Sequence, residues 1–328
     1  MTKIAIIGAG LAGLSAAHLL KDDAEITLFE KARSVSGRMS TRRAGPYSFD
    51  HGAQYFTART KPFQDFIQPM LEQNIIERWN ARYLKFEDDR IIERKNWSDE
   101  EPRYVGVPSM NKVAKFLAKG LDIHINTKIA SLKYQEKWRL TDEQNQQYSG
   151  FDWVICTVPS PQAIALLPET FKYHTDIKAI EMRACFSLML GFEQNLPLEF
   201  EAAHVTDSDV SWIAVNSCKP KRSDPFTLMV HSSEAYAQAH FDSDREQVMQ
   251  HLIAETSSII GCDASAAAYK TIHGWRYANN AQREQTSTIF LDQEYNLAAC
   301  GDWCLGGRVE GGFTSAYNLA LKMKECAL

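Results

Sequence analysis

The sequence predicts an α/β fold with two domains, one built on a parallel sheet and the other a mixed-sheet α+β domain inserted into it. Three observations predict this fold. The chain has 328 residues, enough for two moderate domains. It begins with a strand, a glycine-rich turn, a helix and a second strand, and a strand, a glycine-rich turn and a helix return near its end. Further strands lie between these units, so the domains interleave along the chain.

The spacing of apolar residues, two apart in strands and three or four apart in helices, places the individual elements. The predicted strands are residues 3–7, 25–30, 79–87, 90–97, 121–125, 129–134, 138–141, 153–157, 186–192, 211–215, 226–230 and 295–300. The predicted helices are residues 11–20, 63–71, 112–118, 244–259 and 311–324. We assign residues 1–55, 105–165 and 290–328 to the parallel-sheet domain and residues 56–104 and 166–289 to the inserted domain.

The composition is that of an ordinary globular protein, with 45% hydrophobic and 23% charged residues. A net charge of -5 argues against binding to nucleic acid or to an anionic membrane. The first apolar run, Ile4 to Ile7, is too short for a signal peptide. We therefore expect a cytoplasmic protein with small-molecule partners and reduced cysteines. Cys300 and Cys304 have no second pair or histidine cluster to complete a zinc site, so no metal is predicted.

A glycine motif follows the first predicted strand and opens the first predicted helix. Gly8 allows the tight turn, Gly10 lets the backbone approach a pyrophosphate, and Gly13 permits close packing of helix on strand. The N–H groups at the start of the helix can bind phosphate. The sequence therefore predicts a dinucleotide site, whose candidate residues are Gly8, Ala9, Gly10, Leu11, Ala12 and Gly13.

An acidic residue, Glu30, ends the second predicted strand about 20 residues further on. Its carboxylate can accept hydrogen bonds from both ribose hydroxyls, and it disfavours a 2′-phosphate. Glu30 and its neighbour Lys31 join the candidate site. These residues alone leave FAD and NAD equally possible.

The next segment resembles amine-oxidase-type flavoproteins, in which an acidic residue is followed by Gly-Gly-Arg and a threonine. Here the corresponding run is Ser36-Gly37-Arg38-Met39-Ser40-Thr41, with a serine in place of the first glycine. In that family the arginine contacts the FAD pyrophosphate and the adjoining backbone approaches the flavin. The resemblance implies these roles for Gly37, Arg38 and Met39.

The segment from Leu297 to Ala316 resembles the closing motif of the same superfamily. The resemblance implies that Asp302 bonds to the ribityl or phosphate region and that a helix N-terminus meets the pyrimidine edge of the flavin. The candidate residues here are Gly301, Asp302, Val309, Glu310, Gly311 and Gly312. Motifs from both chain ends together imply FAD, on a Rossmann-like domain of the glutathione-reductase/p-hydroxybenzoate-hydroxylase type.

Three shorter segments also resemble the family. Asp50 to Tyr55 is similar to the loop that passes beside the isoalloxazine, Val154 to Pro159 to a strand that leads to a cofactor contact, and Lys128-Ile129 to the position near the adenine. The candidate cofactor residues implied by these segments are Ala53, Gln54, Lys128, Ile129, Thr157 and Pro159.

Within the superfamily the chain most resembles renalase-like proteins, which oxidise misformed dihydronicotinamide isomers and return the electrons to oxygen as peroxide. Monoamine oxidases read Gly-Tyr-Met-Glu-Gly at the C-terminal turn, where the tyrosine forms part of an amine cage. Here Arg308 takes the tyrosine's place. A cation suits an anionic substrate, such as a reduced nicotinamide dinucleotide, and repels a protonated amine. No cysteine stands in the frame used for covalent attachment, so we expect non-covalent FAD. The resemblance to renalase-like proteins implies molecular oxygen as the acceptor.

Hydride transfer from a dihydropyridine needs positioning more than a strong base, so we assign no catalytic base. Alternate residues of a likely strand point to one face. The candidates for a flat substrate pocket are His273, Trp275, Tyr277, Gln54, Tyr55, Trp303 and Arg308. Two other functions stay open: an amine oxidase or dehydrogenase, and a non-catalytic binding protein on the same scaffold, as in GDP-dissociation inhibitors.

Overall fold

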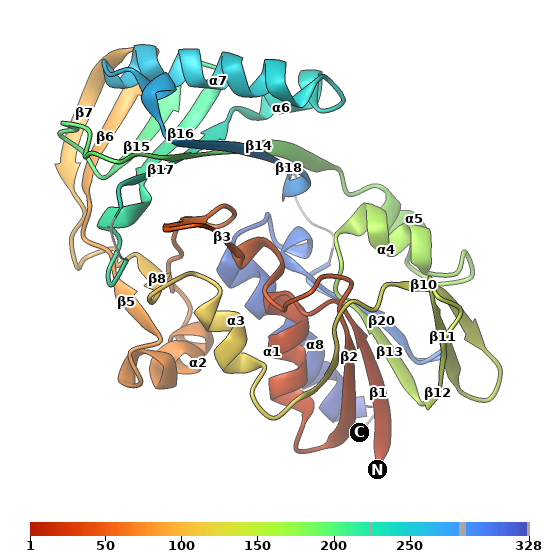
Figure 1. Ribbon diagram of the computed structural model, residues 1–328. Helices are drawn as coiled ribbons and strands as arrows, with labels where there is room; N and C mark the ends of the chain where they lie inside the picture. The colour runs from red at the N-terminus through yellow and green to blue at the C-terminus, as the bar shows by residue number, and fades with distance from the viewer. Residues whose placement is uncertain (223–224, 282–286, 327–328) are drawn as a thin grey trace.

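The computed structural model describes residues 1–222, 225–281 and 287–326. It confirms the α/β fold, which is built around two main sheets (Figure 1). In the described chain, six strands form the first sheet, which we call the parallel sheet, in the order β19-β20-β13-β1-β2-β9. Its strands are β1 (Thr2–Ile7), β2 (Ala24–Phe29), β9 (Asp122–His124), β13 (Trp153–Cys156), β19 (Phe290–Asp292) and β20 (Leu297–Ala299). They run parallel to their neighbours except β19, which is antiparallel to β20.

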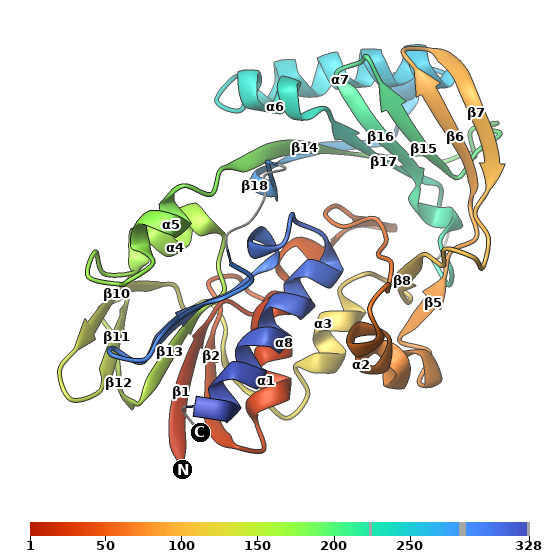
Figure 2. The same ribbon diagram turned by 180° about the vertical axis from the view of Figure 1, so that it is seen from behind.

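Helices cover one face of the parallel sheet. α1 (Leu11–Leu20) and α8 (Val309–Cys326) lie side by side there, with α3 (Lys112–Leu117) next to α1 (Figure 2). Ile4 and Ile6 of β1 are buried among these helices because alternate residues of a strand share a face. The described part of the chain contains no helix that is both long enough and apolar enough to cross a bilayer.

A smaller layer covers the opposite face of the parallel sheet. Ala5 and Ile7 of β1 pack in this second core with the buried Trp138. The elements of this layer are β10 (Ile129–Tyr134), β11 (Trp138–Asp142), β12 (Gln147–Phe151), α4 (Ser160–Leu166) and α5 (His174–Lys178). The parallel sheet is therefore buried on both faces, and the carboxyl ends of its strands are left as the place for a ligand.

The second sheet, which we call the mixed sheet, has seven strands among the residues described, in the order β18-β14-β17-β16-β15-β6-β7. Its strands are β6 (Arg82–Glu87), β7 (Arg90–Asn96), β14 (Met182–Gly191), β15 (Ala202–Thr206), β16 (Val210–Val215), β17 (Thr227–Ser232) and β18 (Tyr269–Asn280). All pairs are antiparallel except β15 with β6. Helices α6 (Glu234–His240) and α7 (Arg245–Ile260) cover its outer face (Figure 1).

Short elements connect the two sheets. They are β3 (Thr41–Ala44), β4 (Tyr47–Asp50), β5 (Ile76–Arg78), α2 (Lys61–Glu72) and β8 (Tyr104–Gly106). The β3–β4 hairpin lies under the inner face of the mixed sheet, where the ring of Tyr47 packs near Tyr269 of β18 at a centroid distance of 5.9 Å (Figure 1). The strand predicted over residues 79–87 is confirmed from Arg82 onward, whereas Trp79 lies in the connection between β5 and β6.

Candidate active site

The glycine turn forms a tight bend at the carboxyl end of β1. Gly8 has a φ of 105°, which favours glycine. A Cβ on Gly13 would lie 1.9 Å from the carbonyl oxygen of Gly8, so this glycine is required for packing of α1 against the turn. A Cβ on Gly10 would instead meet no heavy atom of the described residues within 4 Å. The backbone is therefore close-packed at Gly13 and open at Gly10, as a turn that receives a ligand needs.

Two helix N-termini meet beside this turn. The first helical bond of α1 runs from the N–H of Leu14 to the carbonyl of Gly10 (3.0 Å), and that of α8 from Gly312 to Arg308 (3.3 Å). The N–H groups of the residues in between precede each helical ladder. A Cβ on Gly312 would lie 3.9 Å from the backbone nitrogen of Ala12. The positive ends of both helix dipoles therefore lie together, an arrangement that favours a bound anion.

Glu30 lies at the end of β2 and is only 7% exposed. Its two oxygens accept hydrogen bonds from the N–H groups of Ala9 and Ala32, both at 2.8 Å. Each carboxylate oxygen has a second lone pair, so the side chain can also accept from a ligand's hydroxyls. Neighbouring Lys31 reaches Gln162 of α4 with its Nζ (3.0 Å). Glu30 therefore ties the glycine turn to β2 and retains the capacity expected of a ribose ligand.

An ion pair joins the two ends of the chain. The guanidinium of Arg38 donates to both carboxylate oxygens of Asp302, at 2.9 and 2.5 Å, and to the carbonyl of Ala278 at 2.9 Å. The Arg38 and Asp302 side chains are 29% and 14% exposed. A Cβ on Gly37 would lie 3.3 Å from the Cα of Gly10, which places this pair next to the glycine turn. The structure thus brings together both motifs that the sequence singled out.

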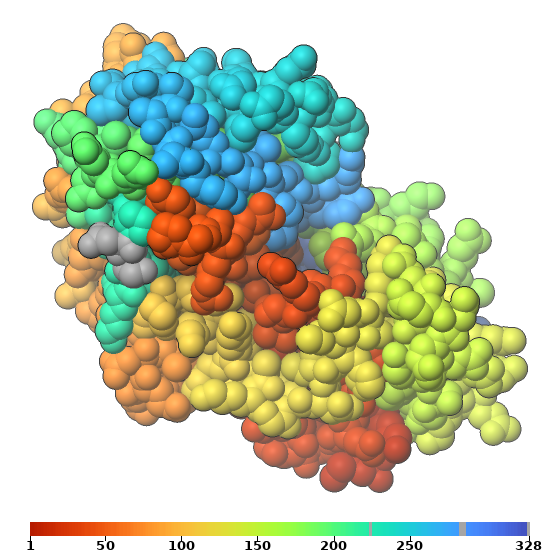
Figure 3. All heavy atoms as spheres, viewed as in Figure 1, coloured from red at the N-terminus to blue at the C-terminus, as the bar shows by residue number. Residues whose placement is uncertain are grey.

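The surface is hollowed where these segments meet. Figure 3 shows this hollow between the red-to-orange atoms of the N-terminal segments and the blue and green atoms beside them.

Ser36 stands at the position where the related motif has glycine, and it takes a φ of 127°. Such a conformation strains a serine, so the turn has kept the geometry of a glycine despite the substitution.

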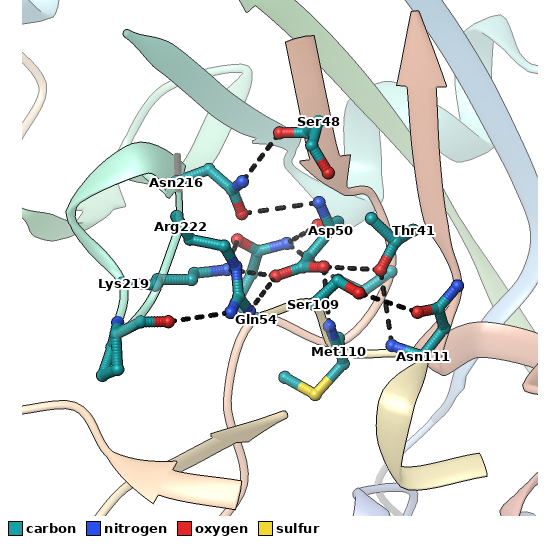
Figure 4. Close-up of polar contacts among 12 residues, drawn as sticks. Thr41, Ser48, Asp50, Gln54, Ser109, Met110, Asn111, Asn216, Lys219 and Arg222 are labelled. Carbon is teal, nitrogen blue, oxygen red and sulfur yellow. Dashed lines mark hydrogen bonds and ion pairs between the residues drawn. The ribbon is translucent and has the colours of Figure 1, made fainter. Parts of the chain in front are cut away.

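The loop that follows β4 packs directly on Arg38. A Cβ on Gly52 would lie 1.9 Å from the Arg38 carbonyl oxygen, and the N–H of Ala53 donates to that oxygen at 2.8 Å. Gln54 is only 6% exposed, and its Nε2 donates to the carbonyls of Asp50 and Gly52 at 2.5 and 3.0 Å (Figure 4). The expectation that Gln54 lines a substrate pocket is therefore corrected, because its amide is spent on holding this loop.

The inner face of the mixed sheet contacts the loop that follows β4, on the side of the loop away from Arg38. A row of directly paired residues crosses this face, formed by Lys85, His204, Trp212, His231, Ser187 and His273. The hydroxyl of Ser187 donates to the carbonyl of His51 (2.7 Å), and the ring of Tyr55 lies 5.7 Å from that of Trp212. The loop thus runs beneath the row, and the sheet sets its position.

Of the residues expected to line a substrate pocket, His273 and Trp275 lie together. The Trp275 indole donates to the His51 carbonyl (2.8 Å), and its ring lies 4.4 Å from that of His273. Tyr277, on the same strand, packs toward the core on the far face of the parallel sheet. Trp303 is fully buried and donates to the carbonyl of Val158 (3.0 Å), so its expected place in a pocket is corrected: it is a core residue.

Six further candidate cofactor residues lie in three different settings. Thr157 touches the glycine turn, since its hydroxyl lies 3.0 Å from the carbonyls of Ile7 and Gly8, and Pro159 is the N-cap residue before α4. Lys128 pairs instead with Glu143. Met39 and Ile129 have buried side chains that pack in the core, and the backbone N–H of buried Gly301 donates to the Ser315 hydroxyl (3.0 Å).

The chain matches two family models. Residues 81–322 match the family model described as flavin containing amine oxidoreductase, and residues 6–69 match an NAD(P)-binding Rossmann-like domain. The chain belongs to the flavin-containing amine oxidoreductase family. It is thus a flavin-dependent oxidoreductase acting on a small molecule, and the expectation of a flavoprotein enzyme is confirmed.

Individual relatives resemble this oxidoreductase at low identity. Renalase of Mus musculus is 20% identical over 358 residues, which cover 99% of each chain. A 4,4'-diapophytoene desaturase of Staphylococcus aureus (strain Newman) is 38% identical over 77 residues, 20% of this chain and 15% of the desaturase. Two solved structures share the fold across 99% of each chain: one from Exiguobacterium sp. 255-15, provisionally named a protoporphyrinogen oxidase (TM-score 0.80, 13% identity), and wild-type putrescine oxidase bound to putrescine (TM-score 0.72, 14% identity).

A buried charged cluster behind the site of this oxidoreductase was missed at the level of sequence. It contains Asp50, Lys219 and Arg222, whose side chains are 0%, 0% and 3% exposed. The run Lys219-Pro220-Lys221-Arg222 has the pattern of a solvated basic turn, and the register that buries two of its cations depends on strands far away in the sequence. No local signal distinguishes those two cations from Lys221.

Glu310 holds α2 with its side chain rather than the cofactor site. Its carboxylate accepts from the N–H groups of Arg59 (3.0 Å) and Thr60 (2.7 Å) and from the Thr60 hydroxyl (2.8 Å). These donors lie at the N-terminus of α2, so Glu310 caps a neighbouring helix. We expect Glu310→Ala to lower the free energy of unfolding by about 1–2 kcal/mol. Urea unfolding measures this loss; a change no larger than that of Glu325→Ala, at the exposed end of α8, would contradict it.

The histidines near the site predict an acid-labile fold. Burial, then the charges of His273 and Arg42, lower the pKa of His51 from 6.5 to about 4, and burial lowers that of His231 to about 3. Between about pH 4 and 6.5 the unfolded chain therefore binds more protons than the folded one, so the free energy of unfolding rises with pH. For His51 alone the rise is on the order of 3 kcal/mol. Unfolding curves at pH 4.5 and 7 test this, and His51→Gln should flatten the difference.

Proposed function

We propose that this oxidoreductase holds FAD non-covalently and oxidises dihydro-NAD(P) isomers, in the manner of renalase-like proteins. The observation that carries the proposal is the Arg38–Asp302 pair, which unites the flavoprotein-like motifs from both chain ends next to two helix N-termini. On this proposal residues 1–55, 105–165 and 290–328 hold the cofactor, and residues 56–104 and 166–289 form the substrate domain.

The donors and acceptors of the site fit FAD group by group. The N–H groups at the start of α1 and the open backbone at Gly10 suit a pyrophosphate, and Glu30 suits the ribose hydroxyls. The start of α8 suits the pyrimidine edge, where negative charge develops on reduction. Bound FAD would supply a two-electron acceptor that takes a hydride at N5 and passes the electrons to oxygen.

The cysteines of the C-terminal motif support non-covalent binding. Cys300 and Cys304 are fully buried, and burial raises the pKa of the Cys304 thiol to about 12. Both thiols therefore stay protonated and enclosed, whereas the thiolate is the reactive form. Acid precipitation of the yellow protein should release all of its flavin into the supernatant, and flavin that stays with the pellet would contradict non-covalent binding.

Arg308 supports an anionic substrate. It stands at the turn before α8 with an exposed side chain, and its guanidinium makes no ion pair or hydrogen bond with the residues in the described ranges. Gly306, Gly307 and Arg308 all have a φ between 72° and 80°, which turns the chain sharply there. A guanidinium at this turn that pairs with none of the described residues suits the phosphates of a dinucleotide and repels a protonated amine.

The substrate-facing surface supplies positioning rather than a strong base. Burial and the charge of Arg42 lower the pKa of His273, so its ring is neutral at neutral pH. Together, the rings of His273 and Trp275 offer an uncharged surface for a planar ring. Such a surface orients a dihydropyridine, whose oxidation is driven by its own aromatisation.

Anaerobic stopped-flow mixing tests the proposed substrate. The flavin absorbance should bleach when the protein meets a dihydro-NAD(P) isomer at micromolar concentration, and it should not bleach with small amines such as putrescine. Bleaching by amines alone would replace the proposed function with amine oxidation, which the family also accommodates. Absence of bleaching with the isomers would contradict the proposal.

A further inference from the structure

Lys219 is a fully buried lysine in a crowded cluster. It belongs to the segment that follows β16, and its Nζ lies 3.1 Å from Oε1 of Gln54 and 3.6 Å from Oδ2 of Asp50 (Figure 4). Arg222, from the same segment, donates to that Asp50 oxygen at 2.6 Å. The other Asp50 oxygen accepts from the Thr41 hydroxyl at 2.7 Å and the Met110 N–H at 2.9 Å.

Among the described residues, the charges of this cluster do not balance. Two buried cations, Lys219 and Arg222, face one described carboxylate, Asp50, and Arg222 makes the shorter contact with it. The group that accepts a hydrogen bond from the Lys219 ammonium at the shorter distance is therefore the amide oxygen of Gln54. Burying an ammonium against a neutral amide costs free energy, and an apolar side chain of similar length would fill the same space at less cost. The fold alone gives no reason for a lysine here.

Gln54 transmits the contact toward the cofactor residues. Its Nε2 donates to the carbonyls of Asp50 and Gly52, and Gly52 packs on the Arg38 carbonyl so closely that no side chain fits between them. Arg38 in turn holds Asp302. A continuous chain of contacts thus leads from Lys219 through Gln54 and the loop backbone to the Arg38–Asp302 pair.

We propose that Lys219 is a positioning residue: it orients the Gln54 amide and thereby holds the loop of residues 50–53 against Arg38 in the geometry that retains FAD. This inference rests on the proposed binding of FAD. Through this contact the segment that follows β16 of the mixed sheet positions the cofactor site directly.

The proton on Lys219 should matter for this role. Burial lowers the pKa of Lys219 to about 8, against the opposing effect of Asp50 and with a further lowering by Arg222. Among the described residues, the ring of Trp79 also faces the ammonium, and His231, which is neutral near pH 8, lies near it. Below pH 8 the ammonium makes a charge-assisted bond to Gln54; above it that bond weakens, because a neutral amine is a poorer donor. FAD should therefore be held less firmly at alkaline pH.

The rate at which the holoenzyme releases FAD tests the proposal. Release is followed by the rise in free-flavin fluorescence after dilution. We expect Lys219→Met to release FAD about tenfold faster than the wild type at pH 7, the equivalent of one charge-assisted hydrogen bond. Gln54→Leu should act similarly, and the double variant should be no faster than the faster single variant, because both changes break one contact. Raising the pH from 7 to 9 should accelerate release from the wild type but not from Lys219→Met.

A matched control separates this role from a general loss of stability. Ile253→Ala removes a buried side chain from α7, on the outer face of the mixed sheet, and should lower the melting temperature without changing FAD release. Release from Lys219→Met at the wild-type rate, or rates that multiply in the double variant, would overturn the proposal. A wild type that holds no FAD would contradict the proposed function instead.

Discussion

Alanine at Gly10 is expected to cost the protein its flavin and leave its fold intact, whereas alanine at Gly13 should damage both. Gly10 has a φ of -76°, which alanine adopts freely, and its Cβ would stand in open space within the described structure. That space is where the proposed pyrophosphate meets the backbone. A Cβ on Gly13 would lie 1.9 Å from the Gly8 carbonyl and 2.8 Å from the Thr157 hydroxyl, so the turn itself must move.

Flavin content and thermal unfolding, measured on both variants, distinguish these two effects. Gly10→Ala should bind FAD at least about a hundredfold more weakly, because a methyl group displaces the phosphate from the N–H groups that bind it. Its unfolding without flavin should match that of the wild type. Gly13→Ala should lose flavin and also unfold more easily, by about 3 kcal/mol, since an overpacked backbone contact has no flexible partner. Normal flavin content in Gly10→Ala would show that the pyrophosphate lies elsewhere.

Arg38→Met should produce the second large effect, the loss of both flavin and stability. It leaves Asp302, which is 14% exposed, without its bidentate partner. Removing one partner of such a pair leaves an uncompensated charge and costs about 3 kcal/mol. The double variant Arg38→Met/Asp302→Leu should recover much of the stability, because no charge remains unpaired, but none of the flavin.

Equilibrium unfolding in urea and flavin content measure the two outcomes of this second prediction. Arg94→Met is the matched control, because Arg94 forms an ion pair with Glu199 at 2.7 Å, but on the exposed surface of the mixed sheet. Exposed pairs contribute little, so this control should change neither quantity appreciably. If Arg38→Met retained its flavin, the Arg38–Asp302 pair would be structural only.

The parts of the fold that depend on local spacing were predictable from the sequence. The range of α1 was predicted without error, because its glycine turn and apolar spacing are local features, and the strand, turn and helix of the C-terminus follow the same logic. The strand over residues 147–151 and the hairpin of β3 and β4 were missed. Their residues alternate too weakly to stand out, and they become strands through the partners that tertiary structure gives them.

The candidate site was predictable only where motif spacing carries the signal. Glycine positions, Glu30 and the Arg38–Asp302 motifs carry meaning through spacing, and the structure brings them together. Side chains such as Gln54 and Trp303 were assigned to a pocket because they follow motif residues, yet their direction depends on contacts with residues far away in the sequence, Lys219 and Val158. The burial of Lys219 follows from the pairing of β16 with β17 and from the loop beneath them, neither of which leaves a trace in the local sequence.

One measurement tests the central claim most directly, an anaerobic titration of the purified holoenzyme followed by its visible spectrum. The account predicts a yellow protein whose flavin absorbance disappears as one equivalent of a dihydro-NAD(P) isomer is added, and returns on exposure to air with formation of hydrogen peroxide. A protein that takes up no FAD, or a yellow protein whose spectrum the isomer leaves unchanged, would contradict it.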